Sequence, residues 1–359
     1  MKTQTDISEN FSYFLHLMQA VLNNTQIQPP DTKADWRSIY EIAIKHSLGG
    51  MLYYALQKLP EKQKPQGKFM AYLAQMYREQ IVADLNLSVE TERMLALLSS
   101  NGIRCMPVKG IVTKSDYPVA HLRSMVDVDI LYDYENRLKV EQIFLDNGYK
   151  RESVSEKDAA YRKDEILHFE MHHSLLKETS PAYSYFSDIW SRAVFKNDTL
   201  VADMSLEDTY IYMLEHLAGH AGGAGAGIRM FMDVYVFLQK HGQELNTEYT
   251  KKILADIKLA DFEKVARKLC HNWFSGEEIV DTKSDIALFI LNSTTFGKVK
   301  TSLLLENLKN NSSSATSNGV RRILAKLFPR FSWMRLRFKA VDKVPVLYPF
   351  YLPVHWIDR

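Results

Sequence analysis

Cysteine is scarce in this sequence, since Cys105 and Cys270 are the only two among 359 residues. They lie far apart in apolar surroundings, which excludes a disulfide framework and a cysteine-based zinc site. Long hydrophobic runs are also missing. No stretch of eighteen apolar residues occurs, so we expect no membrane span. The N-terminus, MKTQTDISEN, lacks the basic stretch and apolar run of a signal peptide. We therefore expect a cytoplasmic protein.

The sequence has little excess charge of either sign, because its formal net charge is only +2. The charge is unevenly distributed, however. The tail 320–359 carries nine Lys and Arg residues against two Asp residues, interleaved with aromatic side chains. Such a tail suits nucleic acid or an anionic membrane surface. The interpretation that we favour is a tail that packs on the acidic remainder of the chain.

A chain of this length is expected to fold as two or three packed units. One long helix, or two, is predicted over Lys68–Ser99, ending at Asn101-Gly102. We predict an α+β fold, with a small mixed β-sheet core flanked by N-terminal and C-terminal helical regions. The predicted regions are an N-terminal helical region 1–100, a catalytic core 101–204, a helical domain 205–309, a polar linker 310–319 and a basic, Pro-rich tail 320–359.

Three strands are predicted in the core, over Ile103–Val108, Val126–Tyr132 and Ile166–Leu176. In the second, apolar residues alternate with Asp127 and Asp129, so both carboxylates point to the same side, roughly 7 Å apart. Two carboxylates this close repel one another and need a counter-charge. A divalent metal is the strongest candidate. The alternative is an exposed strand edge with solvated aspartates.

The surroundings of the acidic pair favour the metal. Upstream, the first strand ends at Lys109-Gly110 before a short helical segment. Backbone N–H groups at such a turn suit phosphate, and Lys109 adds a cation. Downstream, Glu170 lies on the third strand between Phe169 and Met171. Three acids near a phosphate-binding turn indicate two-metal phosphoryl or nucleotidyl transfer.

The run GIRCMPVKGIVTKSDYPVAHLRSMVDVDILYD, followed by ILHFEMHHSLL, resembles the bacterial family of uncharacterised nucleotidyltransferases within the DNA polymerase beta-like superfamily. That family shows a Lys-Gly turn, a Tyr-Pro, an Arg, an acidic pair on a strand and an acid-x-His strand. The matching positions are Lys109-Gly110, Tyr117-Pro118, Arg123, Asp127 with Asp129, and Glu170 with His172. Relatives often carry Asp where this chain has Glu170, and the wider superfamily usually has Gly-Ser in place of Lys109-Gly110.

The resemblance implies that the chain transfers a nucleoside monophosphate from a nucleoside triphosphate to a hydroxyl acceptor and releases pyrophosphate. It implies Mg²⁺ (or Mn²⁺) as the cofactor. Asp127 and Asp129 would hold the nucleotide-bound metal, and Glu170 would join them around a second one. The acceptor could be a sugar, a small metabolite, an RNA end or a protein side chain.

Nucleotide-binding residues are implied in the same way. Lys109 and the amide of Gly110 would bind the β- and γ-phosphates, and Arg123 would neutralise the charge that develops there. Ser124 is a further candidate phosphate donor, with a surface hydroxyl as the alternative. Arg229 follows the glycine-rich stretch GHAGGAGAGIR, interpreted as a flexible connection between helices. It either reaches the nucleotide or forms an ion pair four residues on, with the aspartate of GIRMFMD.

Histidines form two further patterns. His168 and His172 share a strand face with Glu170, which allows a zinc or manganese site, although His172 is more simply a residue that orients Glu170 or contacts phosphate. In HLAGH, His216 and His220 lie one helical turn apart. Their role is either capping and packing or substrate binding.

Three hypotheses about function follow from these patterns. The first is a metal-dependent nucleotidyltransferase, an enzyme with a nucleoside triphosphate as substrate. The second is a nucleotide-binding regulatory or toxin–antitoxin protein with the same fold and no turnover. The third is a zinc-binding protein organised on the histidine strand. The sequence does not identify the nucleotide, the acceptor or the oligomeric state.

Overall fold

The computed structural model describes residues 4–30, 34–221, 226–277, 280, 282 and 284–292. The predicted polar linker and basic tail lie outside the described residues. So does part of the glycine-rich stretch, at 222–225. No described helix is both long enough and apolar enough to cross a bilayer.

A five-stranded mixed sheet forms the centre of the region predicted as the catalytic core. Its spatial order is β1-β2-β5-β4-β3, and only the β2–β5 pair is parallel. A parallel pair requires a crossover, which here includes a helix and the β3–β4 hairpin. The mixed sheet surrounded by helices confirms the predicted α+β class. The strands are β1 (Cys105–Val108), β2 (Val128–Tyr132), β3 (Lys150–Val154), β4 (Asp158–Arg162) and β5 (His168–His172), with a separate two-stranded ribbon of β6 (Val194–Phe195) and β7 (Ala202–Asp203).

The strands are shorter than the alternation of apolar residues predicts. β2 begins at Val128, so Asp127 precedes the strand, and the prediction that both aspartates lie on it was wrong. The β3–β4 hairpin was not predicted at all. Every residue of β3 is exposed or half-buried, so this edge strand lacks the apolar alternation that marks a half-buried one.

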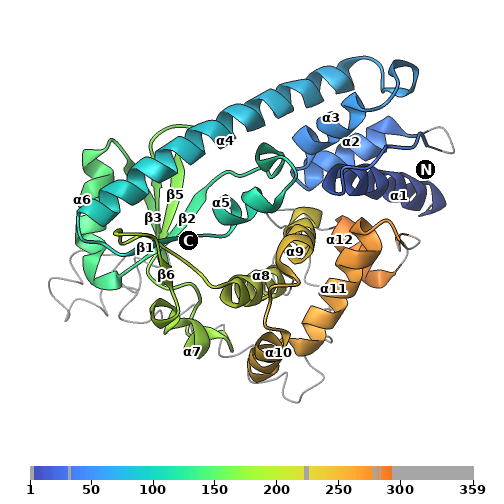
Figure 1. The fold of residues 1–359 in the computed structure, drawn as a ribbon. Helices are drawn as coiled ribbons and strands as arrows, with labels where there is room; N and C mark the ends of the chain where they lie inside the picture. The colour runs from blue at the N-terminus through green and yellow to red at the C-terminus, as the bar shows by residue number, and fades with distance from the viewer. Residues whose placement is uncertain are drawn as a thin grey trace, which may run out of the picture.

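Helices make up most of the remaining described chain (Figure 1). They are α1 (Gln4–Leu22), α2 (Trp36–Lys45), α3 (Gly49–Gln57), α4 (Lys68–Ser100), α5 (Gly110–Thr113), α6 (Arg137–Asp146), α7 (Tyr183–Phe186), α8 (Leu206–Ala221), α9 (Ile228–His241), α10 (Thr247–Asp256), α11 (Ala260–Phe274) and α12 (Asp285–Asn292).

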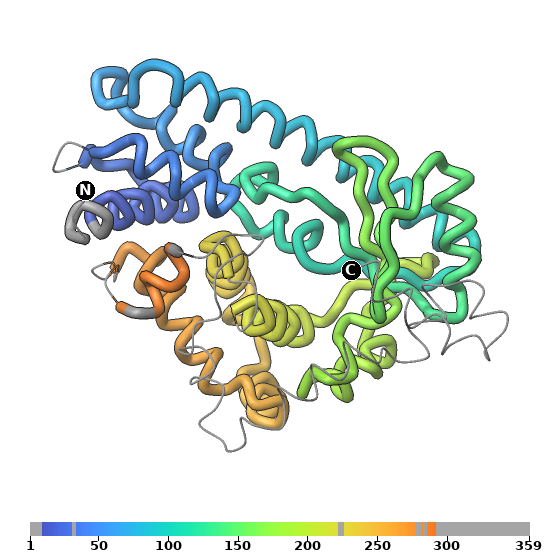
Figure 2. Tube along the Cα trace, turned by 180° about the vertical axis from the view of Figure 1, so that it is seen from behind, coloured from blue at the N-terminus to red at the C-terminus, as the bar shows by residue number. Residues whose placement is uncertain are grey.

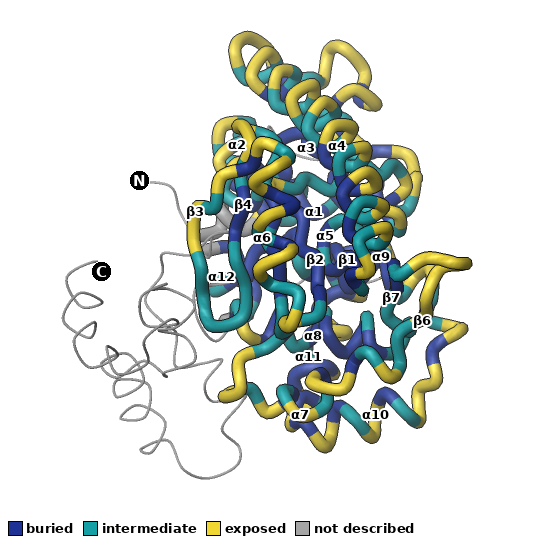
Figure 3. The backbone as a smooth tube through the Cα atoms, turned by 90° about the vertical axis from the view of Figure 1, so that its left-hand side faces the viewer, coloured by how far each residue is buried: buried dark blue, intermediate teal, exposed yellow. Residues whose placement is uncertain are grey.

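One face of the sheet is covered by α4 and α6. Leu87 and Met94 of α4 belong to one buried cluster with Phe144 of α6 and with Val128 and Phe169 of the sheet. The outer side of α4 faces solvent (Figure 3). The helix is continuous over 33 residues and is followed by Gly102, whose φ of 74° suits glycine at a helix end. Because apolar side chains fill this face of the sheet, the polar side chains of the central strands lie on the opposite face.

The N-terminal helices share a hydrophobic core with the helices of the last third of the chain (Figure 2). The Phe11 ring of α1 packs edge-on against Trp273 of α11, with centroids 5.6 Å apart. The side-chain amide of Asn23 donates to the Phe274 carbonyl at 2.6 Å. The first N–H of α9, at Ile228, donates to the buried His46 Nδ1 at 3.3 Å. These contacts join α11 and α9 to the N-terminal helical region.

Candidate active site

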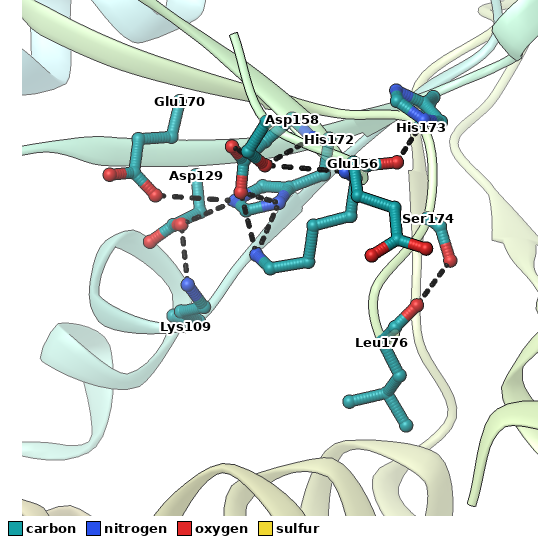
Figure 4. A network of polar contacts seen from close by, with 11 residues as sticks. Lys109, Asp129, Glu156, Asp158, Glu170, His172, His173, Ser174 and Leu176 are labelled. Carbon is teal, nitrogen blue, oxygen red and sulfur yellow. Dashed lines mark hydrogen bonds and ion pairs between the residues drawn. The ribbon is translucent and has the colours of Figure 1, made fainter. Parts of the chain in front are cut away.

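The turn after β1 carries Lys109 in an unusual backbone conformation. Its φ is 58°, a region that non-glycine residues rarely adopt and that recurs at functional sites. Val108 pairs with Asp129 across the antiparallel β1–β2 ladder, which places the next residue beside that carboxylate. Lys109 Nζ donates to Asp129 Oδ1 at 2.6 Å (Figure 4). Lys109 is therefore the counter-ion of Asp129 in this structure.

Asp129 and Glu170 are direct neighbours across the parallel β2–β5 ladder. Adjacent strands lie about 4.8 Å apart, so the two carboxylates stand side by side. His172 shares a face of β5 with Glu170, and its Nε2 lies 2.7 Å from Asp129 Oδ1 and 3.6 Å from Glu170 Oε2. Ligand atoms of these three residues all lie within 4.8 Å of one another. Among the described residues they form a group able to hold a metal ion.

Lys157, just before β4, and Asp158 both approach Nδ1 of His172. Lys157 Nζ lies 3.3 Å from His172 Nδ1 and 2.7 Å from Asp158 Oδ2, and this oxygen lies 3.5 Å from Nδ1. An ammonium group can only donate, so the nearer contact, with Lys157, favours the neutral ring whose Nδ1 accepts and whose proton is on Nε2. Burial lowers the pKa of His172, in keeping with a neutral ring. The Nε2–H group then donates to Asp129, and His172 orients this carboxylate instead of offering a lone pair to a metal.

The surroundings of the three acids shift their pKa values in different directions. Burial alone would raise the pKa of Asp129, but Lys109 and His172 outweigh it and hold that pKa well below its usual range. Burial, and then the charge of Asp129, raise the pKa of Glu170 to about 7. The same two causes raise the pKa of Asp127. The nearby cations therefore compensate Asp129 but leave the other two acids in need of a counter-charge.

A cavity of about 290 Å³ opens at this end of the sheet. Asp127, Asp129 and Glu170 all line it, although Asp127 lies outside the group of ligand atoms described above. Further lining comes from α8, through His216 and His220 among others, and from α9. The cavity thus has an acidic side on the sheet and a second side formed by the two helices.

Arg123 also lines the cavity, but its charge is already paired. Its Nε donates to Asp233 Oδ1 at 3.2 Å and its Nη2 donates to Oδ2 at 2.8 Å, with both side chains about nine-tenths buried. The Tyr117 hydroxyl donates to the same Oδ1 at 2.7 Å. Gly110 allows this arrangement, because a Cβ there would lie 2.2 Å from Arg123 Nη1. Asp233 is therefore the partner of Arg123, and the predicted ion pair with Arg229 is not formed.

Arg229 and Ser124 connect α9 to the loop before β2. Arg229 Nη1 donates to the carbonyl and hydroxyl oxygens of Ser124, at 2.8 and 3.0 Å. The Ser124 hydroxyl in turn donates to the Ser47 carbonyl at 2.7 Å. The hydroxyl is thus engaged by two partners, and the predicted alternative of a plain surface hydroxyl is wrong. Arg229 reaches the cavity lining, whereas Ser124 does not.

His168 and His172, for which the sequence allowed a shared zinc or manganese site, have different partners in the structure. His168 Nε2 lies 3.4 Å from Glu152 Oε2 on β3. The metal-binding group found among the described residues contains His172 but not His168. Both histidines lie on the same face of β5 as Glu170. They stand two residues away from it in opposite directions along the strand, however, so they contact different residues of the neighbouring strand.

The sequence did not indicate Lys157 as a partner of His172 or Asp233 as the partner of Arg123. It left the roles of His216 and His220 open. Lys157 belongs to the unpredicted hairpin, and only the strand register places it beside His172. Asp233 was assigned to its near neighbour on the helix because helical spacing was the one available signal. The pairing with Arg123 spans 110 residues of chain, which no local pattern reveals.

Parts of this chain are similar to a family model and to solved structures. The model of a family described as uncharacterised nucleotidyltransferase matches residues 32–275. Among solved structures, the antibiotic-resistance factor ANT(2'')-Ia is 12% identical, with a TM-score of 0.37, over 52% of this chain and 98% of its own. An antigenic nucleotidyltransferase-like protein from Paracoccidioides brasiliensis is 16% identical, with a TM-score of 0.33, over 52% and 92%. A comparison with curated proteins gave no match. The chain belongs to the family of uncharacterised nucleotidyltransferases.

Proposed function

We propose that this protein is a metal-dependent nucleotidyltransferase that transfers a nucleoside monophosphate from a nucleoside triphosphate to a hydroxyl acceptor. One observation carries the proposal. Asp129 and Glu170 stand side by side on β2 and β5, and Asp127 lines the same cavity, in a chain of a nucleotidyltransferase family. The acceptor class stays open among sugars, small metabolites, RNA ends and protein side chains.

The side chains present fit a divalent cation. Carboxylate oxygens are the ligands that Mg²⁺ prefers, and three carboxylates line one cavity. Burial first, and then the charge of Asp129, raise the pKa values of Asp127 and Glu170, and the nearby cations do not offset these effects. Bound Mg²⁺ or Mn²⁺ would supply charge compensation for the phosphates and lower the pKa of an acceptor hydroxyl. Asp127, Asp129 and Glu170 are the residues that would hold it.

The roles of the protein's own groups follow from their contacts. Glu170 lines the cavity beside Asp129 and would be the carboxylate that takes the proton of the acceptor hydroxyl. The acceptor oxygen then forms a bond to the α-phosphorus, the bond from this phosphorus to the bridging oxygen breaks, and pyrophosphate leaves. His172 and Lys109 hold Asp129 in position from two sides. Lys109 and Arg123 are each paired with a carboxylate, so a phosphate would be bound by the N–H groups that these pairs leave over.

The test is pyrophosphate release with each α-labelled nucleoside triphosphate, in Mg²⁺ or Mn²⁺, across a panel of hydroxyl acceptors. We expect Asp129→Asn and Glu170→Gln to lower the rate by roughly 10²- to 10⁴-fold, the usual range for a group that moves a proton or stabilises charge. Asp261→Asn, which changes an exposed carboxylate on α11, is the matched control and should keep the full rate.

Two results would contradict the proposal. Undiminished pyrophosphate release by Asp129→Asn would remove the acid cluster from the reaction. Nucleotide binding without pyrophosphate release across the panel would favour the alternative of a nucleotide-binding protein without turnover.

A further inference from the structure

The side of the cavity formed by α8 and α9 presents three basic side chains, His216, His220 and Arg229, which we call the α8–α9 wall. They face the same space as the acidic residues of the sheet. The two histidines lie one turn apart on α8, with ring centroids 4.6 Å from one another. The ion pairs around the cavity show that Arg229 lacks a carboxylate within ion-pair distance among the described residues.

Two of the three permanent cations that line the cavity already have a carboxylate partner. Lys109 is paired with Asp129 at 2.6 Å. Arg123 is paired with Asp233 at 2.8 Å. Within the described part of the chain, no carboxylate lies within ion-pair distance of the third, Arg229. Asp233 and Asp127 act on the charge of Arg229 only from beyond that distance.

Arg229 is nonetheless buried, with only 9% of its surface exposed. Its hydrogen bonds to described residues go to the two oxygens of Ser124, and its Nε has no partner there. Burial, and then the neighbouring Arg123, lower the pKa of Arg229 to about 10, so the guanidinium is still charged at neutral pH. A buried charge is costly without a partner. Tying α9 to Ser124 needs a donor but no charge, so the charge itself is unexplained by the fold.

His216 and His220 supply further polar groups on the lining of the same cavity. Neither makes a hydrogen bond to another residue of the described chain, and both rings line the cavity. Burial, and then the positive charge of Lys109, lower the pKa of each, so both are neutral at physiological pH. A neutral imidazole keeps one N–H donor. One guanidinium and two N–H donors on one wall match the oxygens of a tetrahedral anion.

We infer that the α8–α9 wall binds a phosphoryl group, with Arg229 as its counter-charge and His216 and His220 as flanking donors. This site differs from the Lys109-Gly110 turn, where the resemblance to the family places phosphate. The phosphoryl group belongs either to the tail of a nucleoside triphosphate or to a phosphorylated acceptor, since both have the same chemistry. The inference deepens the proposed function, but binding at this wall requires no turnover.

The experiment measures binding by calorimetry in the presence of a chelator, so that no divalent metal contributes. Inorganic tripolyphosphate and inorganic phosphate are the probes. Arg229→Gln keeps an amide donor for Ser124 and removes the charge. We expect it to weaken tripolyphosphate binding roughly ten- to hundredfold, the loss of one charged hydrogen-bond partner. Arg37→Gln, which removes an exposed arginine on α2, is the control for overall charge and should leave the affinity unchanged.

A purely structural arginine would behave differently. Its loss would lower the unfolding temperature without changing the affinity of the protein that stays folded. We expect Arg229→Gln to unfold at the same or a higher temperature, because a buried unpaired charge is removed. Arg229→Lys keeps the charge without the planar fork and should bind with intermediate affinity. Unchanged affinity of Arg229→Gln for both probes would overturn the inference.

A nucleotide series separates the two sources of the phosphoryl group. If the wall binds the triphosphate tail, Arg229→Gln reduces the affinity for ATP to that for AMP. If it binds an acceptor phosphate, the affinity for ATP is kept while binding of inorganic phosphate is lost. Failure of the proposed function is distinguishable, because it would show as absent pyrophosphate release in a protein that still binds tripolyphosphate through Arg229.

Discussion

The buried pair of Arg123 and Asp233 gives the sharpest stability prediction. The substitution is Asp233→Asn, which keeps one carbonyl oxygen for the Tyr117 hydroxyl but removes the negative charge. Arg123 is then left buried without a counter-charge, with Arg229 as a second cation close by. Removing one member of a buried pair costs about 3–5 kcal/mol, because the remaining charge stays in a poorly solvated place.

Urea unfolding followed by fluorescence measures this loss, with Asp261→Asn as the control. The control breaks an exposed pair with Lys264, so we expect a change of at most about 1 kcal/mol. The double variant Arg123→Met with Asp233→Leu replaces both charges by apolar groups and should recover most of the loss. A loss under about 1 kcal/mol for Asp233→Asn, or a double variant no more stable than the single one, would refute the reasoning.

Two further predictions concern packing and pH. Gly110→Ala should cost about 1–3 kcal/mol in urea unfolding, because its Cβ would displace the Arg123 guanidinium, and an unchanged midpoint would contradict the contact described here. Burial of His46, and then the charge of Lys45, lower its pKa from 6.5 to about 3, so the unfolded state takes up a proton that the folded state refuses. Stability from this residue is complete about one pH unit above 6.5 and falls as the pH drops through 6.5 towards 3, by about 1.4 kcal/mol between roughly pH 7.5 and 5.5. His46→Asn keeps an acceptor for the Ile228 N–H and should lose this part of the slope; an unaltered slope would exclude His46 as its source.

The elements that the sequence predicts well are those whose signal is local. The helix that starts at Lys68 carries apolar residues at helical spacing and a glycine with positive φ just beyond its end. The central strands carry apolar residues at every second position. The residues that resemble the nucleotidyltransferase motif were recognisable because their spacing along the chain is short. In all these cases the physical cause lies within a few residues.

Other features depend on which strands and helices become neighbours. The shortening of β2, which leaves Asp127 before the strand, depends on where the ladder with β5 begins, at the pair of Val128 and Phe169. The tautomer of His172 depends on Lys157, which reaches it only through the β4–β5 register. That Arg229 has no ion-pair partner among the described residues follows only from the structure, in which Asp233 is paired with Arg123. Sequence patterns contain the residues of such a site but not the pairing among them.

The core shared by the N-terminal and C-terminal helices has a consequence for how the protein is made. About 150 residues of chain separate the end of α3 from the start of α8. At ordinary translation speeds the ribosome needs roughly ten to thirty seconds to add them. During that interval the apolar faces of α1–α3 have no partners from α8 to α12 and are exposed to chaperones and to aggregation. The cavity lined by the acids is completed only after this interval, when the newly synthesised α9 docks against helices that were synthesised first.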